Sequence, residues 1–411
     1  MQVLCGDIGE RHLGSPGEAR AADYIAGAFA ALGYPVVREE FHAPGWTYGR
    51  YGLSLAATGE TFPCFPCFYS NAGEVTGKLF PFDLRDTPHL AAEAVRSRIC
   101  LARGRFGDVS DTNTAADRLD ALGAAAMIVT SPYRDTVSTK IVRNPDPKKL
   151  AVVTISQATT EALSRHRDEE FTLFVEARNF PTVSWNVVGR RVPTKWAQRA
   201  CERRGREAGG GAPGARKVVI GAHYDTAPGI QGAWDNATGT SVVLELARLL
   251  AGKTGDGAVD FIAFGGEEFG GKVGAGLGGY CYANDHAAGY PRSGWRDRIA
   301  WMGCVDGVGA CRGRLKVGLG GSEGLRERVQ RVCDPAGVKV GGFLQGSDNN
   351  IFHARGIPNV LFCEEDASGS GWPVPLHAVE DCLEQVDPDR LTAICELVAN
   401  TFEDLFQAVA G

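Results

Sequence analysis

Seven side chains between residues 223 and 377 are of the types that bind divalent metal ions or act beside them. They are two imidazoles and five carboxylates: His223, Asp225, Asp235, Glu267, Glu268, Asp306 and His377. Zn²⁺ takes imidazole nitrogen and carboxylate oxygen at about 2.0–2.2 Å, and a catalytic zinc keeps one position open for water. Five of these side chains are enough to ligate two zinc ions that share a water. The set predicts a metal-centred hydrolase.

The positions of these residues relative to predicted strands indicate that they meet. Each of three apolar segments is directly followed or ended by candidates: 218–221 by His223 and Asp225, 259–264 by Glu267 and Glu268, and 299–305 by Asp306. Asp235 lies in a turn that leads into a predicted helix from Gly239. Because binding residues of an α/β sheet collect beyond the carboxyl ends of its strands, we expect one shared rim.

Chemistry separates the ligands from two auxiliary acids. Two ions about 3.5–4 Å apart need a bridging ligand, for which a carboxylate with two oxygens is suited. Asp225 lies two positions after His223 on an extended segment, so its carboxylate is predicted to accept the second imidazole N–H and fix the tautomer. Glu267 precedes the candidate ligand Glu268 and is predicted to be the general base.

The order of predicted elements indicates an α/β fold with a mixed, mostly parallel sheet and helices on both faces. Ser15-Pro16-Gly17-Glu18 predicts a capped helix start, with Glu18 completing a capping box, and a strand is expected at 36–41. Continuous apolar strands alternate with helices from about Ser184. Between them lie short apolar strands and no candidate ligand. We therefore predict a catalytic domain from 1–65 and 180–411, and a small β-rich inserted domain at 66–179.

The motifs around the candidate ligands resemble those of the dizinc exopeptidase family that includes bacterial leucyl aminopeptidases and glutamate carboxypeptidase. They are HYDT at His223, WDNATG at Asp235, GGEEFG at Glu267, CVDG at Asp306, LHAVED at His377 and GSDNNIFHARGIP from Gly346 to Pro358. The resemblance covers the N-terminal helix and strand and everything from about Ser184. The inserted segment is similar to the protease-associated domain that some members carry.

Membership would imply specific roles for the matching residues. His223 and either Glu268 or Asp306 would lie on separate ions. Asp235 would bridge the two ions, and His377 would be the fifth ligand. Asp225 would be the orienting acid and Glu267 the general base. The cofactor implied is two Zn²⁺ per chain, with Co²⁺ or Mn²⁺ as alternatives. The chain departs from the family at Asn349 and at Leu376-His377-Ala378, which bears on substrate class and not on the ligands.

The predicted activity is removal of an N-terminal residue from peptides. The alternatives are a carboxypeptidase or dipeptidase on the same scaffold, a single-zinc glutaminyl cyclase and a non-catalytic binding protein. The number of zinc ions per chain separates a two-zinc peptidase from the cyclase and from the binding protein. The inserted domain is predicted to be a lid or an access element. The net charge of −6 and the lack of a basic stripe argue against a nucleic-acid partner. No apolar run has the length of a membrane span, and neither a signal peptide nor a disulfide framework is visible, so a cytoplasmic location is expected.

Overall fold

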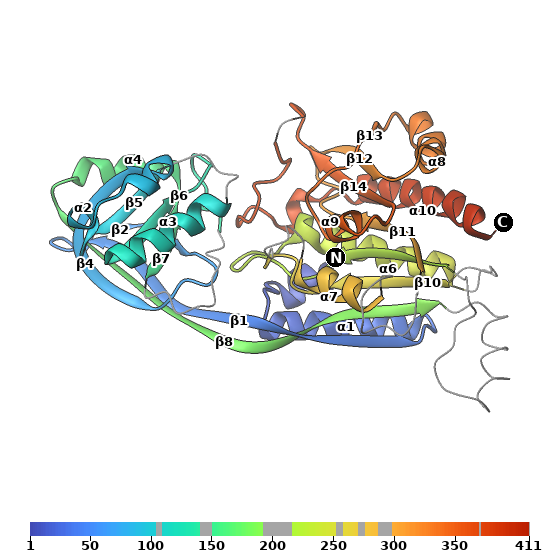
Figure 1. The fold of residues 1–411 in the computed structure, drawn as a ribbon, viewed down its shortest axis with the longest axis horizontal. Helices are drawn as coiled ribbons and strands as arrows, with labels where there is room; N and C mark the ends of the chain where they lie inside the picture. The colour runs from blue at the N-terminus through green and yellow to red at the C-terminus, as the bar shows by residue number, and fades with distance from the viewer. Residues whose placement is uncertain are drawn as a thin grey trace.

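Two lobes are joined by two long antiparallel strands in the computed structural model. The structure describes residues 1–103, 109–139, 150–191, 216–251, 258–269, 276–286, 298–369 and 371–410. The joining strands are β1 (Val36–Leu55) and β8 (Glu170–Arg191), which pair from Val36↔Gly189 to Leu55↔Phe171 (Figure 1). One end of this ribbon belongs to the larger lobe and the other end to the smaller lobe.

The larger lobe is built on a mixed, mostly parallel sheet, which confirms the predicted fold class. Its strands besides β1 and β8 are β9 (Arg216–His223), β10 (Ala258–Phe264), β11 (Arg298–Val305), β12 (Arg314–Gly320), β13 (Val340–Gly341) and β14 (Asn359–Glu365). The order is β13-β12-β14-β11-β9-β10-β8. Neighbours β10, β9, β11 and β14 are parallel, whereas β12 and β8 run antiparallel to β14 and β10.

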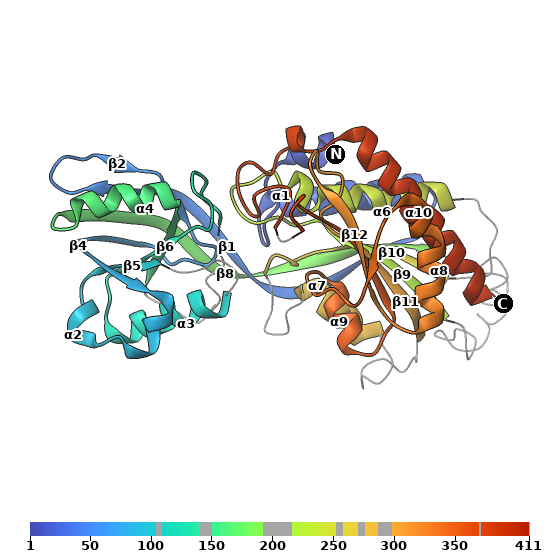
Figure 2. The same ribbon diagram turned by 90° about the horizontal axis from the view of Figure 1, so that it is seen from above.

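Helices cover both faces of this sheet (Figure 2). On one face lie α1 (Pro16–Ala31), α6 (Thr238–Leu250) and α10 (Pro388–Ala410), with α8 (Glu323–Cys333) against α10; on the other lie α7 (Leu277–His286) and α9 (Asn349–Ala354). Successive side chains of a strand point to opposite faces. Val218 and Ile220 accordingly pack with α1, α6 and α10, while Val219 packs with α7 and α9. Burial on both sides explains why the strands are continuously apolar.

The start of α1 follows the predicted capping chemistry with one difference. The Ser15 hydroxyl accepts the Glu18 N–H at 3.1 Å, and Pro16 is the first helical residue. The Glu18 carboxylate accepts the N–H of Gly14 at 2.7 Å, one residue before the position that a capping box uses. Its other oxygen accepts the hydroxyl of Ser184 on β8, so this cap also ties α1 to the ribbon.

The ribbon is longer than the sequence indicates. A strand was expected at 36–41, but β1 continues to Leu55 because nearly every residue pairs with β8. Pro44, Gly45 and Gly52 oppose a strand by local propensity. Gly45 is nonetheless required, since a Cβ there would lie 2.6 Å from the Phe180 ring. Long-range pairing therefore outweighs local preference.

The smaller lobe has its own sheet and two apolar clusters. Its elements are β2 (Thr61–Phe62), β3 (Phe65–Pro66), β4 (Gly73–Asp83), α2 (Ala92–Val95), β5 (Ile99–Arg103), α3 (Val109–Leu122), β6 (Ala126–Thr130), β7 (Ala151–Ile155) and α4 (Gln157–Leu163). Strands β4, β5, β6 and β7 are parallel in that order. Its identity as a protease-associated-like domain at 66–179 stays a prediction. Within the described ranges no helix is both long and apolar enough to cross a bilayer.

Candidate metal centre

Three adjacent parallel strands deliver candidate ligands to one edge of the larger sheet. Strand β9 lies between β10 and β11. His223 is the last residue of β9, and Asp306 directly follows β11. Glu268 follows β10 after a turn in which Gly266 has φ +68°, a conformation that glycine adopts without strain. The shared rim expected from strand placement is present.

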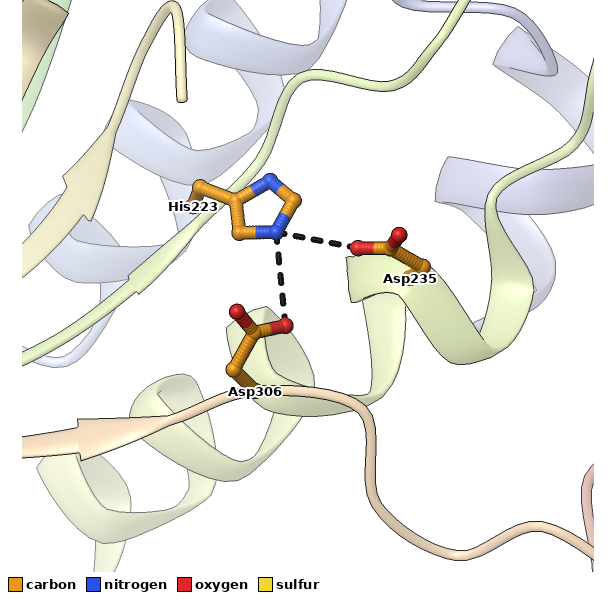
Figure 3. Close-up of side chains that lie close together, drawn as sticks. All are labelled: His223, Asp235 and Asp306. Carbon is orange, nitrogen blue, oxygen red and sulfur yellow. Dashed lines mark ion pairs between the residues drawn. The ribbon is translucent and has the colours of Figure 1, made fainter. Parts of the chain in front are cut away.

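The first group of candidate ligands consists of His223, Asp235 and Asp306. The His223 Nε2 lies 3.1 Å from Asp235 Oδ1 and 3.4 Å from Asp306 Oδ1 (Figure 3). The three come from β9, the turn before α6 and the end of β11. One imidazole nitrogen and two carboxylate oxygens thus face a common point.

The second group consists of Asp235, Glu268 and His377. The His377 Nε2 lies 2.8 Å from Glu268 Oε2 and 3.6 Å from Asp235 Oδ2. His377 is in the irregular segment between β14 and α10. In each group the possible ligand atoms all lie within 4.8 Å of one another.

Asp235 belongs to both groups and turns one oxygen to each imidazole. Oδ1 faces His223, and Oδ2 faces His377. This is how a carboxylate can bridge two cations. Two imidazole nitrogens and three carboxylates are donors suited to zinc, with two donors on either side of Asp235. The residues present therefore fit a pair of zinc ions, and Co²⁺ or Mn²⁺ would accept the same donors.

Electrostatics in the centre also favour bound cations. Asp235 and Glu268 are 7% and 4% exposed, and Glu268 Oε1 is buried without a hydrogen-bond partner. Burial raises the pKa of Glu268 and, separately, the pKa of Asp306, in both cases despite a nearby imidazole. Buried carboxylates are costly unless they are paired or coordinate a metal. A cation at each group would remove that cost.

The imidazoles respond to the same carboxylates. Burial by itself would lower the pKa of His223, but Asp306, Asp225 and Asp235 outweigh it and raise that pKa well above the usual value. For His377, burial is outweighed by Glu268 and Asp235, which raise the pKa to about 9. Since a ligating imidazole is neutral, metal binding must release these protons.

The Asp225 carboxylate makes contacts that the sequence did not indicate. Its two oxygens accept the backbone N–H groups of Glu267 at 3.0 Å and Glu268 at 3.1 Å. The Nδ1 of His223 lies 3.2 Å from the backbone carbonyl of Asp225 and 3.6 Å from its carboxylate. The carboxylate thus fixes the turn that carries Glu267 and Glu268. Its predicted role in fixing the His223 tautomer stays a prediction.

Glu267 directly precedes Glu268 in the sequence and is partly buried, and the charges of His223, Glu268 and Asp306 act on its carboxyl. Burial, with the nearby charges of Asp348 and Glu268, raises the pKa of its carboxyl well above the usual value. A carboxylate held near acids in this way is a stronger base than a solvated one. Its role as general base is a proposal developed below.

Asp381 was not predicted as a site residue, although it is the last residue of the LHAVED motif. It is 1% exposed, and its carboxylate accepts the backbone N–H groups of Trp234 at 2.6 Å and Asp235 at 3.1 Å. Burial and the charge of Asp235 raise the pKa of Asp381 to about 7. Its position in the motif, four residues after His377, is the sequence signal that could have identified it.

Arg11 was also missed, because Glu10-Arg11-His12 is typical of a solvated charged segment. Its side chain is fully buried, and its guanidinium donates to five backbone carbonyls at 2.7–3.0 Å, those of Leu4, Gly9, Tyr224, Gln231 and Gly232. Three of the five belong to the segment that connects His223 to Asp235. Arg11 therefore fixes this connection to the N-terminal segment.

The sheet and the two groups of ligands define an α/β protein with a candidate dinuclear metal centre. Residues 207–402 match the model of peptidase family M28. The chain is 26% identical over 97% of its length to aminopeptidase YwaD of Bacillus subtilis, of which it covers 82%.

Solved structures agree with this match. A zinc aminopeptidase from Bacillus subtilis, BSAP, superposes with a TM-score of 0.75 at 26% identity, covering 98% of this chain and 92% of that one. An aminopeptidase from Aneurinibacillus sp. strain AM-1 has the same fold, with a TM-score of 0.69 at 24% identity over 98% and 91%. This chain thus matches peptidase family M28 over residues 207–402, and the members of that family are hydrolases.

Proposed function

We propose that this peptidase is a metal-dependent aminopeptidase with two zinc ions in the site. The first ion would be held by His223, Asp235 and Asp306, and the second by Asp235, Glu268 and His377. The division of Asp235 between the two groups, one oxygen to each imidazole, is the observation that carries the proposal. The names of the similar aminopeptidases support the reaction class.

The proposed reaction is hydrolysis of the first peptide bond. When bound, zinc ions would lower the pKa of a shared water and polarise the scissile carbonyl. Glu267 would accept one proton from the attacking water and deliver it to the leaving amino nitrogen as the C–N bond breaks. Asp225 would hold the Glu267 backbone in place through the hydrogen bond at 3.0 Å.

Arg11 is not available to anchor the terminal carboxylate of a substrate. A carboxypeptidase needs a free cationic group to bind the terminal carboxylate. Arg11 is the arginine whose charge acts on Asp235, and its guanidinium is buried and committed to backbone carbonyls. Arg11 thus does not serve as that anchor.

A matched set of peptides tests this proposal. We expect cleavage of peptides with a free N-terminus, cleavage of the same peptides after C-terminal amidation, and none after N-acetylation. Chelation should abolish turnover, and added Zn²⁺ should restore it. Cleavage that needs the free carboxyl terminus would instead identify a carboxypeptidase.

The metal content of the same preparation separates the remaining alternatives. Two zinc ions per chain are expected by elemental analysis after gel filtration. One ion per chain would favour single-zinc chemistry such as that of a glutaminyl cyclase. A chain that binds no zinc would point to a non-catalytic protein with a peptidase fold.

A further inference from the structure

His377 lies in a backbone conformation that needs support. Its φ of +54° is in the left-handed region, which is unfavourable for a residue with a Cβ. The residue lies outside regular structure, between β14 and α10, so no strand ladder holds its peptide groups. Something else must keep its imidazole directed at Glu268 and Asp235.

That support comes from the smaller lobe, through the segment 133–139 that follows β6. The Tyr133 hydroxyl accepts the N–H of Leu376 at 2.8 Å, and the Ser138 hydroxyl donates to the carbonyl of Leu376 at 2.8 Å. The Thr139 N–H donates to the carbonyl of His377 itself at 2.8 Å. The peptide groups on both sides of His377 are therefore fixed by another lobe.

Further contacts extend this junction and bury it. Ser138 and Ala378 form an antiparallel bridge, and the Thr136 hydroxyl donates to the Glu380 carboxylate. Ser138 and Ala378 are both 0% exposed. In Figures 1 and 2 the segment between β14 and α10 reaches toward the smaller lobe, where these contacts form.

The 133–139 segment is itself anchored within its lobe. The Tyr133 N–H donates to the Ser131 hydroxyl at 3.2 Å, and its carbonyl accepts the N–H of Gln157 at the start of α4 at 3.1 Å. The Arg134 carbonyl accepts the next N–H of α4, that of Ala158, at 2.8 Å. Hydrogen bonds to α4 therefore hold in place the segment whose hydroxyls contact the His377 segment.

We propose that the smaller lobe is a structural part of the metal centre, in which Tyr133 and Ser138 are positioning residues that hold His377 in its ligating conformation. The inference rests on the proposed function, since it concerns the zinc ion assigned to His377. It differs from a lid, because a lid acts on substrate access and leaves metal affinity unchanged. Groups that orient a ligand typically alter metal affinity by about 10–100-fold.

Zinc affinity of the full-length protein tests the proposal without reference to turnover. The double variant Tyr133→Phe with Ser138→Ala is measured by chelator-buffered Zn²⁺ titration. Its affinity for one of the two zinc ions should be lower than that of the wild type by about 10-fold or more, and its affinity for the other should stay within twofold. The visible spectrum of the Co²⁺-loaded protein should change for one ion only. Thr76→Val is the control, because it removes an exposed hydroxyl of the same lobe that contacts Thr172 between β4 and β8, and it should change neither affinity.

The outcomes separate this inference from the proposed function. If the double variant binds each of the two zinc ions as tightly as the wild type does, the inference is overturned and the proposed function is not. A wild-type protein that binds no second ion would overturn both. If the double variant does not fold, Tyr133→Phe carries the test: a loss of about threefold or more for one ion is expected from one hydrogen bond, and an unchanged affinity would refute it.

Discussion

Replacing Asp381 with Asn tests whether Asp235, the proposed bridging ligand, depends on a side chain that is not itself a candidate ligand. The Asp381 carboxylate accepts two backbone N–H groups, from Trp234 at 2.6 Å and from Asp235 at 3.1 Å. Asn keeps the shape but has one acceptor oxygen, so its NH₂ group must face one of the two N–H donors. One charge-assisted hydrogen bond is lost, which costs about 1.5–3 kcal/mol.

Because Asp235 contacts both groups of ligands, this cost should fall on both ions. We expect the affinity for each zinc to decrease by about 10–100-fold, in line with other groups that orient a metal ligand. Chelator-buffered Zn²⁺ titration of the purified protein measures both constants. Asp389→Asn, an exposed carboxylate at the start of α10, is the matched control. Affinities of Asp381→Asn within twofold of the wild type would show that Asp235 is held without Asp381.

Three further predictions concern the base, the buried cation and a buried acid. Glu267→Gln should keep both zinc ions and lose turnover by about 100-fold or more, as measured by elemental analysis and steady-state kinetics; near-wild-type turnover would exclude Glu267 as the base. Arg11→Met removes five hydrogen bonds to backbone carbonyls, so calorimetry should show a melting temperature lower by about 10 °C, at about 1 kcal/mol per hydrogen bond and about 2 °C per kcal/mol. The exposed control Arg20→Met should change the melting temperature little. Burial raises the pKa of Glu18 to about 8, so ionisation of its carboxyl destabilises the fold as pH rises from the unfolded pKa of 4.5 through 8. Compared with the wild type, Glu18→Gln should therefore be more stable at pH 9 than at pH 5. Parallel pH profiles of melting temperature for the two proteins would refute this.

The placement of most candidate ligands at one edge of the sheet was predictable, because it depends on local sequence patterns. The apolar segments before His223, Glu267 and Asp306 are recognisable as strands, and parallel strands end at one edge. That argument places the residues without knowledge of any contact. His377 is different, since it follows no strand directly, and only the resemblance of its motif indicated that it joins the others.

Contacts between segments distant in sequence were not predictable in the same way. The charged sequence around Arg11 has no local property that distinguishes a buried guanidinium from a solvated one. The length of β1 depends on its partner β8, which begins more than a hundred residues later. The Asp225 carboxylate accepts N–H groups from the turn after β10, and its spacing from His223 indicates a different partner. In each case the deciding partner is set by tertiary packing.

The two imidazoles of the centre obtain their rigidity from different sources. His223 ends a central strand with a parallel neighbour on each side, so the strand ladders hold its backbone in place. His377 has no ladder and a left-handed φ, and its flanking peptide groups are bonded to the smaller lobe. Because the segment of His377 is bonded to the smaller lobe and His223 lies in the larger sheet, any movement between the lobes would change the second group first. We therefore predict that gradual unfolding releases the zinc ion assigned to His377 before the other ion. Measuring zinc release together with the unfolding signal of each lobe would check this prediction.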